Sequence, residues 1–323
     1  MRVLVTGASG FLGQATAAAV RDAGHDVRTF QRRPSRVPGV TDVLGSMTDP
    51  DAVTGAVESI DAVVHLAAKV SLAGDADDFV RVNVDGTRAL VAAARAAGVS
   101  RFVFVSSPSV AHTGSSLVGV DAGPAEPDRA RGDYARTKAA AELLALDADA
   151  PGFAVVAVRP HLVWGPGDTQ LVGRIVDRAR TGRLPLLDSG AALIDTLYVD
   201  NAASAMVAAL DHAADDGVHG NAYVVTNGEP RPVADLLAGI CVASGVPAPR
   251  LHVPAGVARV AGSLVEAVWR VRPGQDEPPM TRFLAEQLST AHWFDQRRTR
   301  RDLEWTPAVS IDEGFARLAA AAR

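Results

Sequence analysis

Short runs of β-branched and other apolar residues alternate along the chain with longer, alanine-rich segments. The apolar runs are typical of buried strands and occupy 1–5 (MRVLV), 25–30 (HDVRTF), 61–68 (DAVVHLAA), 100–107 (SRFVFVSS) and 153–160 (FAVVAVRP). The segments 14–24, 82–98 and 131–148 have the length and composition of helices. Strands that alternate with helices in this way predict an α/β fold with a doubly wound parallel sheet.

The pattern changes after residue 160, where the apolar runs become shorter and less regular. Residues 194–213 (IDTLYVDNAASAMVAALDHA) again read as a strand and a helix. We therefore predict that 1–160 and 191–227 form the main domain, and that 161–190 and 228–323 form a smaller substrate-binding lobe. The aromatic residues of this lobe are more typical of core than of substrate contacts; they are Trp164, Trp269, Phe283, Trp293 and Phe294.

Composition and charge narrow the class of protein. The 323 residues carry a net charge of −5, which gives no basic footprint for nucleic acid. The single cysteine, Cys241, excludes an internal disulfide and fits a reducing compartment. No signal peptide precedes the first strand, so a cytoplasmic location is expected.

One late apolar stretch, 253–271, contains Arg259, Glu266 and Arg270, too many charges for a membrane helix. We expect it to be a helix packed on the protein's own core. A lid over an apolar substrate, or a surface that contacts a membrane or another enzyme of the same pathway, stays open.

Three glycines, Gly7, Gly10 and Gly13, lie between the first strand and the first helix. In a dinucleotide-binding turn the first glycine allows the tight turn, and the second lets the backbone approach a pyrophosphate. The third lets the helix pack closely, with its N-terminal amides facing the phosphates. Ser9 can add a hydroxyl to this cradle. The turn therefore predicts a dinucleotide cofactor.

The end of the second strand predicts which dinucleotide is bound. An acidic residue there accepts hydrogen bonds from the adenosine ribose, but this chain continues with Gln31, Arg32, Arg33 and, further on, Arg36. Guanidinium groups bind a 2′-phosphate that a carboxylate would repel. We predict that Arg32 and Arg33 bind the 2′-phosphate of NADP, and no metal site is expected.

Lysine is scarce in this chain, because Lys69 and Lys138 are the only two among 32 basic residues. Lys138 falls four residues after Tyr134, so the two side chains lie on one face of a predicted helix. An ammonium beside a tyrosine is expected to favour the phenolate and so to activate the residue for proton transfer. Ser106 and Ser107 end the preceding strand, where either hydroxyl can bind a carbonyl oxygen.

The motifs TGASGFLG, HLAA, VNVDGT, FVFVSSPSV, YARTK and RPHLVWGPGD occur in this order over nearly the whole chain. Together they resemble the extended short-chain dehydrogenase/reductase family, which implies a Rossmann fold and a catalytic triplet of Ser107, Tyr134 and Lys138. Thr-Asp-Glu, which replaces the serine region in dehydratases of this family, is absent, so dehydration is disfavoured.

The resemblance also implies the cofactor-binding residues, segment by segment. The pyrophosphate loop corresponds to Gly7, Gly10, Phe11, Leu12 and Gly13, and the ribose loop to Leu66, Ala67, Ala68 and Lys69. Asn83 of the VNVDGT motif is also expected among the cofactor-binding residues. The nicotinamide side corresponds to Pro160, His161 and Leu162. At the adenine position Ser46 and Met47 replace the acidic and apolar residues usual in the family.

Within this family, the chain most resembles the 3β-hydroxysteroid dehydrogenase-like branch. In that branch it is most similar to the bacterial 2-alkyl-3-ketoalkanoate reductases of olefin biosynthesis. This resemblance implies NADPH-dependent reduction of a long-chain β-keto acid, a small apolar ketone substrate and a homodimer. A 3β-hydroxysteroid dehydrogenase is the main alternative. A sugar-nucleotide epimerase and a regulatory NADP-sensing protein are weaker ones, the latter because the catalytic triplet is intact.

Overall fold

The computed structural model describes residues 1–70, 75–112, 114–258, 260–262, 265 and 289–322. Its centre is a seven-stranded, fully parallel sheet in the order β12-β7-β5-β4-β1-β2-β3. The strands are β1 (Arg2–Thr6), β2 (Asp26–Gln31), β3 (Thr41–Leu44), β4 (Ala62–His65), β5 (Arg101–Val105), β7 (Ala154–Pro160) and β12 (Asn221–Val225). The central strands are mostly apolar and almost entirely buried because helices cover both faces.

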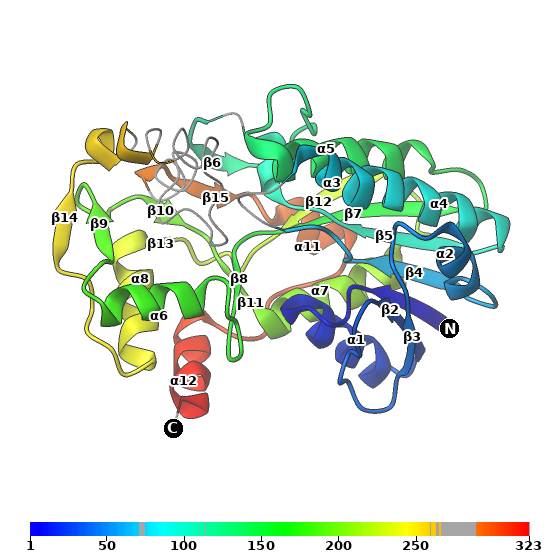
Figure 1. Cartoon of the computed structure of the whole chain (residues 1–323), viewed down its shortest axis with the longest axis horizontal. Helices are drawn as coiled ribbons and strands as arrows, with labels where there is room; N and C mark the ends of the chain where they lie inside the picture. Colours follow the sequence, from blue (N-terminus) through cyan, green and yellow to red (C-terminus); the bar gives the residue numbers. More distant parts are fainter. Residues whose placement is uncertain (71–74, 113, 259, 263–264, 266–288, 323) are drawn as a thin grey trace.

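Helices lie on both sides of this sheet (Figure 1). Two of them, α1 (Phe11–Asp22) and α7 (Val199–His212), share one apolar core with the sheet. The opposite core is covered by α2 (Pro50–Ala56), α4 (Gly86–Ala96) and α5 (Gly132–Asp147). The predicted doubly wound parallel fold is confirmed.

The helix expected over 82–98 differs in its first turn. Residues Val80–Asp85 form a π-helix, η1, which follows the short helix α3 (Ala76–Phe79) and leads directly into α4. A π-helical turn is rare and is found mainly at functional sites.

A smaller lobe adjoins the sheet domain and is drawn on the left in Figure 1. It contains a four-stranded sheet in the order β13-β10-β15-β6 and two pairs of short strands. The strands of this sheet are β6 (Leu117–Val120), β10 (Leu193–Ile194), β13 (Arg231–Pro232) and β15 (His292–Phe294). One pair consists of β8 (Val163–Trp164) and β11 (Leu197–Tyr198), and the other of β9 (Pro185–Leu187) and β14 (Leu251–Val253). Its helices are α6 (Val172–Arg180), α8 (Val233–Ala243) and α12 (Ile311–Ala321).

The C-terminal segment returns to the sheet domain before it reaches α12. Helix α11 (Arg297–Asp302) is bound to β12, where Thr299 Oγ1 donates to the Val224 carbonyl oxygen at 2.8 Å. Leu303 and Trp305 then pack in the core beside the sheet. The chain therefore crosses between the two parts several times, and the predicted domain boundaries stay a prediction.

Residues 259, 263–264 and 266–271 of the late apolar stretch lie outside the described residues, as does Phe283, and Trp269 is among them. Within the described ranges, no helix is both long enough and apolar enough to cross a membrane. Trp164 and Phe294 are buried in the core, at 1% and 5% exposure.

Candidate active site

A cavity of about 910 Å³ opens at the carboxyl ends of the central strands. Open α/β sheets bind ligands at this edge. All but three of the residues predicted for the site line it; the exceptions are Arg33, Asn83 and His161. The lining residues that were predicted are Gly7, Ser9, Gly10, Phe11, Leu12, Gly13, Arg32, Ser46, Met47, Leu66, Ala67, Ala68, Lys69, Ser107, Tyr134, Lys138, Pro160 and Leu162.

The glycine turn has the geometry that a phosphate cradle needs. Gly7 has a φ of +77°, and a Cβ there would come within 2.8 Å of the Ala67 backbone nitrogen. A Cβ at Gly13 would overlap the Gly7 carbonyl oxygen. Gly10 is the N-cap of α1, and no side chain caps this helix end. The first amides of α1 are therefore left to bind an anion in the cavity, so the turn fits a dinucleotide.

The end of β2 carries an amide where a carboxylate would bind the adenosine ribose. Gln31 lines the cavity, and its Nε2 donates to Thr29 Oγ1 at 3.0 Å and to Asp42 Oδ1 at 3.1 Å. Asp42, from β3, is not among the lining residues. Arg32 is exposed and lines the cavity, whereas Arg33 is exposed but does not. Of these two arginines, only Arg32 therefore reaches the cavity.

A buried histidine fixes the loop that follows β4. His65 Nδ1 lies 2.7 Å from Thr6 Oγ1, and its Nε2 lies 3.0 Å from Thr87 Oγ1. Thr6 Oγ1 also accepts a hydrogen bond from the Ala67 amide at 3.1 Å. Burial, followed by the nearby Lys138 charge, lowers the pKa of His65 to about 3, so the ring is a neutral bridge. The loop 66–69 is thereby held against the glycine turn.

Asn83 holds the other end of the same loop and does not line the cavity. Its Oδ1 accepts from the Lys69 amide at 2.7 Å, and its Nδ2 donates to the Lys69 carbonyl at 3.2 Å and to Thr137 Oγ1 at 3.0 Å. Asn83 is 2% exposed. The π-turn that carries it therefore links the loop 66–69 to α5, and the geometry gives Asn83 a positioning role.

Helix α5 brings Tyr134 and Lys138 to the cavity one turn apart. Lys138 Nζ donates to the Val105 carbonyl at 2.6 Å and lies 4.0 Å from the centre of the Phe104 ring. Burial lowers the pKa of the Lys138 ammonium to about 7, although the Glu142 carboxylate acts in the opposite direction. This partial loss of charge weakens the support that the ammonium can give to a neighbouring anion.

The protonation state of Tyr134 differs from the activated phenolate that the sequence predicted. Although part of its side chain is accessible from the cavity, burial raises the pKa of the phenol to about 12. Desolvation of the charged form is the cause of this rise. The phenol is protonated at neutral pH, which is the form that donates a proton.

The two serines at the end of β5 have different surroundings. Ser107 is partly accessible, and its Oγ accepts from the Ser109 amide at 3.3 Å and from Ser109 Oγ at 3.0 Å. Ser106 is 4% exposed, and its Oγ has no partner within the described part of the chain. Both line the cavity, and Ser107 is the one whose hydroxyl can reach a ligand.

Strain marks the segment that follows β7. Leu162 has a φ of 46°, a left-handed conformation that a bulky residue rarely adopts and that costs about 1–3 kcal/mol. His161 is buried, and its Nδ1 donates to the Asp195 carbonyl at 2.6 Å. Burial lowers the pKa of His161 to about 4. Pro160 and Leu162 line the cavity on either side of this anchored histidine.

Several lining residues were not predicted from the sequence. They are Phe30, Gln31, Gly45, Thr48, Val70, Asp78, Arg81, Val82, Val105, Val163, Gln170 and Leu171; Ser106 also lines the cavity and was named from the sequence only as the alternative to Ser107. Most adjoin a predicted residue along the chain, which was a usable signal. Asp78, Arg81 and Gln170 had no such signal, because α3, η1 and the turn before α6 bring them to the cavity.

Comparison with known proteins agrees with this geometry. The NAD dependent epimerase/dehydratase family matches residues 3–226. The chain is 42% identical to a 2-alkyl-3-oxoalkanoate reductase of Stenotrophomonas maltophilia, over 99% of both chains. It is 31% identical to a 3-beta-hydroxysteroid dehydrogenase of Mycolicibacterium neoaurum, over 98% of this chain and 89% of the other.

A solved structure of a short-chain dehydrogenase/reductase superfamily protein from Agrobacterium tumefaciens, with bound NAD, matches 99% of this chain and 97% of its own. The TM-score is 0.75 and the identity is 25%. The predicted family resemblance is confirmed, as is the prediction of an oxidoreductase with a nicotinamide cofactor. The chain belongs to the NAD dependent epimerase/dehydratase family, among the extended short-chain dehydrogenases/reductases.

Proposed function

We propose that the protein is an NADPH-dependent reductase that converts a long-chain 2-alkyl-3-ketoalkanoic acid to the 3-hydroxy acid. The observation that carries this proposal is that Ser107, Tyr134 and Lys138 line the same cavity as the uncapped N-terminus of α1. The reductase at 42% identity over the full length supports the substrate class.

In the proposed reaction, the bound nicotinamide supplies a hydride to the C3 carbonyl carbon. Tyr134 donates its phenolic proton to the carbonyl oxygen, and Ser107 donates a hydrogen bond to the same oxygen. The Lys138 ammonium stabilises the phenolate that remains. Only one of its N–H groups is used by the Val105 carbonyl, so two others are left for the phenolate and a ribose hydroxyl.

Arg32 supports NADPH as the cofactor. It lines the cavity, and within the described ranges it has no hydrogen-bond or ion-pair partner that a 2′-phosphate would have to displace. Loss of one charge-assisted hydrogen bond of about 1.5–3 kcal/mol corresponds to roughly ten- to hundredfold in affinity. We expect Arg32→Gln to lower kcat/KM for NADPH by that factor and to leave the value for NADH nearly unchanged.

The neighbouring arginine provides the matched control for this test. Arg33 is exposed but does not line the cavity, so Arg33→Gln should change the NADPH preference much less. Equal efficiency of the wild type with NADPH and NADH would refute the cofactor assignment.

The side of the cavity formed by 160–171 supports an apolar substrate. Leu162, Val163 and Leu171 line it there, in the same cavity as Ser107 and Tyr134. Each buried methylene contributes about 0.8 kcal/mol, which is roughly fourfold in kcat/KM. The decisive experiment is NADPH oxidation measured with 2-alkyl-3-keto acids of increasing chain length and with keto-steroids.

The expected result is that kcat/KM rises with chain length and that steroids react slowly. The steroid dehydrogenase at 31% identity keeps the second candidate open. Equal efficiency from short to long keto acids, together with fast NAD-linked oxidation of a 3β-hydroxysteroid, would favour that candidate. A protein that turns over no ketone with NADPH would instead be a cofactor-sensing protein. The homodimer stays a prediction.

A further inference from the structure

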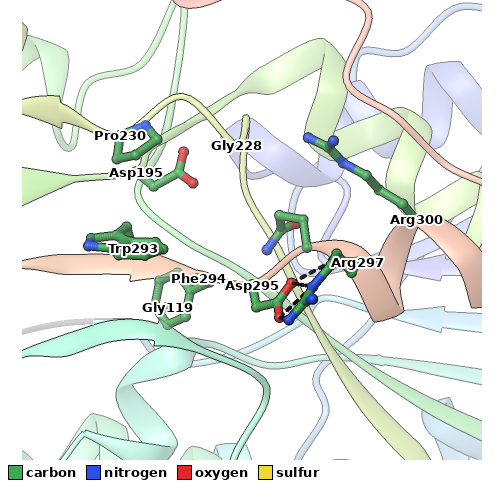
Figure 2. Close-up of a pocket in the computed structure, with 10 residues that line it drawn as sticks. Gly119, Asp195, Gly228, Pro230, Trp293, Phe294, Asp295, Arg297 and Arg300 are labelled. Carbon is green, nitrogen blue, oxygen red and sulfur yellow. Dashed lines mark hydrogen bonds and ion pairs between the residues drawn. The ribbon is translucent and has the colours of Figure 1, made fainter.

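A second cavity, of about 430 Å³, lies between the small sheet and helix α11 (Figure 2). None of the residues that line it belongs to the cofactor cavity. It is lined by Gly119 of β6, Trp293 and Phe294 of β15, Asp195, Gly228, Pro230, Asp295, Gln296, Arg297 and Arg300. Its volume lies within the range of small-molecule sites.

The buried floor of this second cavity contains a hydrogen-bond donor without an acceptor. Gln296 is 6% exposed, and its Oε1 accepts from the Thr226 amide at 3.2 Å. This bond fixes the orientation of the side-chain amide, so Nε2 is the atom left over. Nε2 has no acceptor in the described part of the chain. A buried donor in this state costs about 1–3 kcal/mol, and a ligand oxygen would remove that cost.

The carboxylate of Asp195 also lines this cavity, but it accepts no hydrogen bond from Gln296 Nε2. It is 1% exposed, and it accepts from Thr226 Oγ1 at 2.7 Å and from the Glu229 amide at 3.2 Å. Burial raises the pKa of the Asp195 carboxyl to about 6, so it is also a weaker counter-charge than an exposed aspartate. Gln296 Nε2 therefore stays without an acceptor in the described part of the chain, although a carboxylate lines the same cavity.

Of the two arginines on the rim, only Arg297 forms an ion pair within the described part of the chain. Arg297 is paired with Asp295, with Nε to Oδ2 at 2.9 Å. Arg300 has no hydrogen-bond or ion-pair partner among the residues that the structure describes. Figure 2 shows its guanidinium reaching toward Gly228, across the pocket from Trp293 and Asp195. A Cβ at Gly228 would come within 2.6 Å of Arg300 Nη2, so glycine leaves the room that this guanidinium occupies.

The remaining wall is apolar and partly flat. Trp293 packs with its ring 2.8 Å from the position of a Cβ at Gly119, and Phe294 and Pro230 complete this side. An unpaired guanidinium and a free amide donor beside an indole ring suit an anion that has a planar apolar body.

We propose that this cavity binds a small organic carboxylate, with the carboxylate held by Arg300 and Gln296 and the apolar body packed on Trp293. Benzoate is the simplest probe with this chemistry. Its uncharged analogue benzamide has nearly the same shape and serves as the matched ligand. The proposal is independent of the substrate assigned to the cofactor cavity.

The test is calorimetric titration of benzoate into the full-length protein saturated with NADPH. Saturation with the cofactor fills the nucleotide part of the first cavity, and the Arg300 and Gln296 variants then show whether benzoate binds in the second one. We expect a dissociation constant in the millimolar range, about tenfold weaker binding of benzamide, and about tenfold weaker binding of benzoate to Arg300→Gln and to Gln296→Leu.

Arg301→Gln is the matched control, because Arg301 is the next residue of α11, pairs with Asp302 and does not line the cavity. It should bind benzoate as the wild type does. The proposal is overturned if the wild type does not bind benzoate, if benzamide binds equally well, or if Arg301→Gln weakens binding as much as Arg300→Gln. Thermal unfolding of each variant establishes that the fold is intact before binding is compared.

Discussion

Tyr134 holds the proton that the proposed reduction consumes, and its surroundings keep that proton in place at neutral pH. Burial raises the pKa of the phenol to about 12. Removal of one positioned proton donor typically costs about 10²–10⁴-fold in rate. We therefore expect Tyr134→Phe to lower kcat by a factor in this range while the dissociation constant of NADPH changes little. Stopped-flow NADPH oxidation and a fluorescence titration of NADPH measure the two quantities.

The serine pair provides the control for this prediction. Ser107→Ala should lower kcat, because the accessible Ser107 hydroxyl is the one placed to bind the substrate oxygen. Ser106→Ala removes a buried hydroxyl that has no partner within the described residues, so it should leave both kcat and stability nearly unchanged. A larger loss of kcat in the Ser106 variant would exchange the roles of the two serines.

Lys138 makes the reaction pH-dependent. Burial lowers the pKa of its ammonium to about 7, so the charged form is populated below pH 7 and is lost as the pH rises through 7. We expect kcat/KM for reduction to fall above about pH 7 for this reason. The free energy of unfolding should instead rise as the pH increases from about 7 to about 10. In this range the unfolded lysine, with its ordinary pKa near 10.4, binds more protons than the buried lysine of the folded protein.

The scarcity of lysine makes this pKa directly measurable. Lysine-selective ¹³C labelling gives signals from only two side chains, Lys69 and Lys138, and Lys138→Arg assigns them. A Lys138 signal that titrates near pH 10 in the protein without cofactor would contradict the prediction.

At the residue scale, the sequence predicts which chemical groups lie in the site better than it predicts their protonation states. Tyr134, Lys138 and Ser107 could be located from a rare pairing of residues and from a strand end. The raised pKa of Tyr134 could not, because desolvation depends on which atoms surround the hydroxyl after folding. Gln296 and Arg300 carry no motif at all, and only the fold places them at one cavity.

The π-turn η1 is the element that connects the loop 66–69 to helix α5, which carries Tyr134 and Lys138. Asn83 makes this connection with three hydrogen bonds, to both backbone groups of Lys69 and to Thr137. We expect Asn83→Ala to raise the KM for NADPH about tenfold, because the loop 66–69 is released, and to lower kcat much less, because α5 still carries Tyr134 and Lys138. Initial-rate kinetics separate the two effects.

Asn221 offers a matched control for this element. It also makes three side-chain hydrogen bonds, to the carbonyls of Gly217, Val218 and His219, but it lies away from the cavity. Asn221→Ala should lower the melting temperature without changing the KM for NADPH. If both variants change KM equally, the effect of Asn83 is general destabilisation rather than positioning.

At the scale of elements, the strands of the large sheet could be predicted because each is a continuous apolar run between helical segments. The small sheet could not be predicted, since its strands are two to four residues long and come from four distant segments. Their pairing depends on the tertiary fold that brings these distant backbones together, which a local pattern does not contain. The π-turn likewise escaped prediction, because the apolar spacing of 80–85 does not distinguish it from an α-helix.

For the whole molecule, the fold class and the family follow from the order of motifs along the chain, while the composition of the smaller lobe does not. Leu303 and Trp305 lie late in the sequence, yet they pack beside the large sheet. The apolar side of the proposed substrate site also comes from Leu162, Val163 and Leu171, not from the aromatic residues of the late segment that the structure describes. Substrate selectivity therefore depends on how the two parts meet.

Both lysines of the chain, Lys69 and Lys138, line the larger cavity, and Lys69 lies outside helix α5. Lys69 Nζ lies 3.0 Å from Asp78 Oδ2, and Arg81 pairs with the same carboxylate. Two cations thus share one anion, which leaves a net positive charge on the cavity wall. Because Asn83 links Lys69 to Thr137, this wall adjoins the helix that carries Tyr134.

In a 3-keto acid the carboxylate is separated from the reacting carbonyl by a single carbon, so a cation beside the catalytic helix can bind one while Tyr134 protonates the other. We expect Lys69→Met and Arg81→Met each to raise the KM for a 2-alkyl-3-keto acid about tenfold, and to leave kcat/KM for the corresponding ketone without a carboxylate unchanged. Arg88→Met is the matched control, because Arg88 pairs with Asp85 at the same i,i+3 spacing but does not line the cavity. Equal losses with the acid and the ketone would show that Lys69 and Arg81 serve the cofactor instead, since a cofactor contact affects every substrate alike. No loss with either substrate would place the carboxylate elsewhere in the cavity.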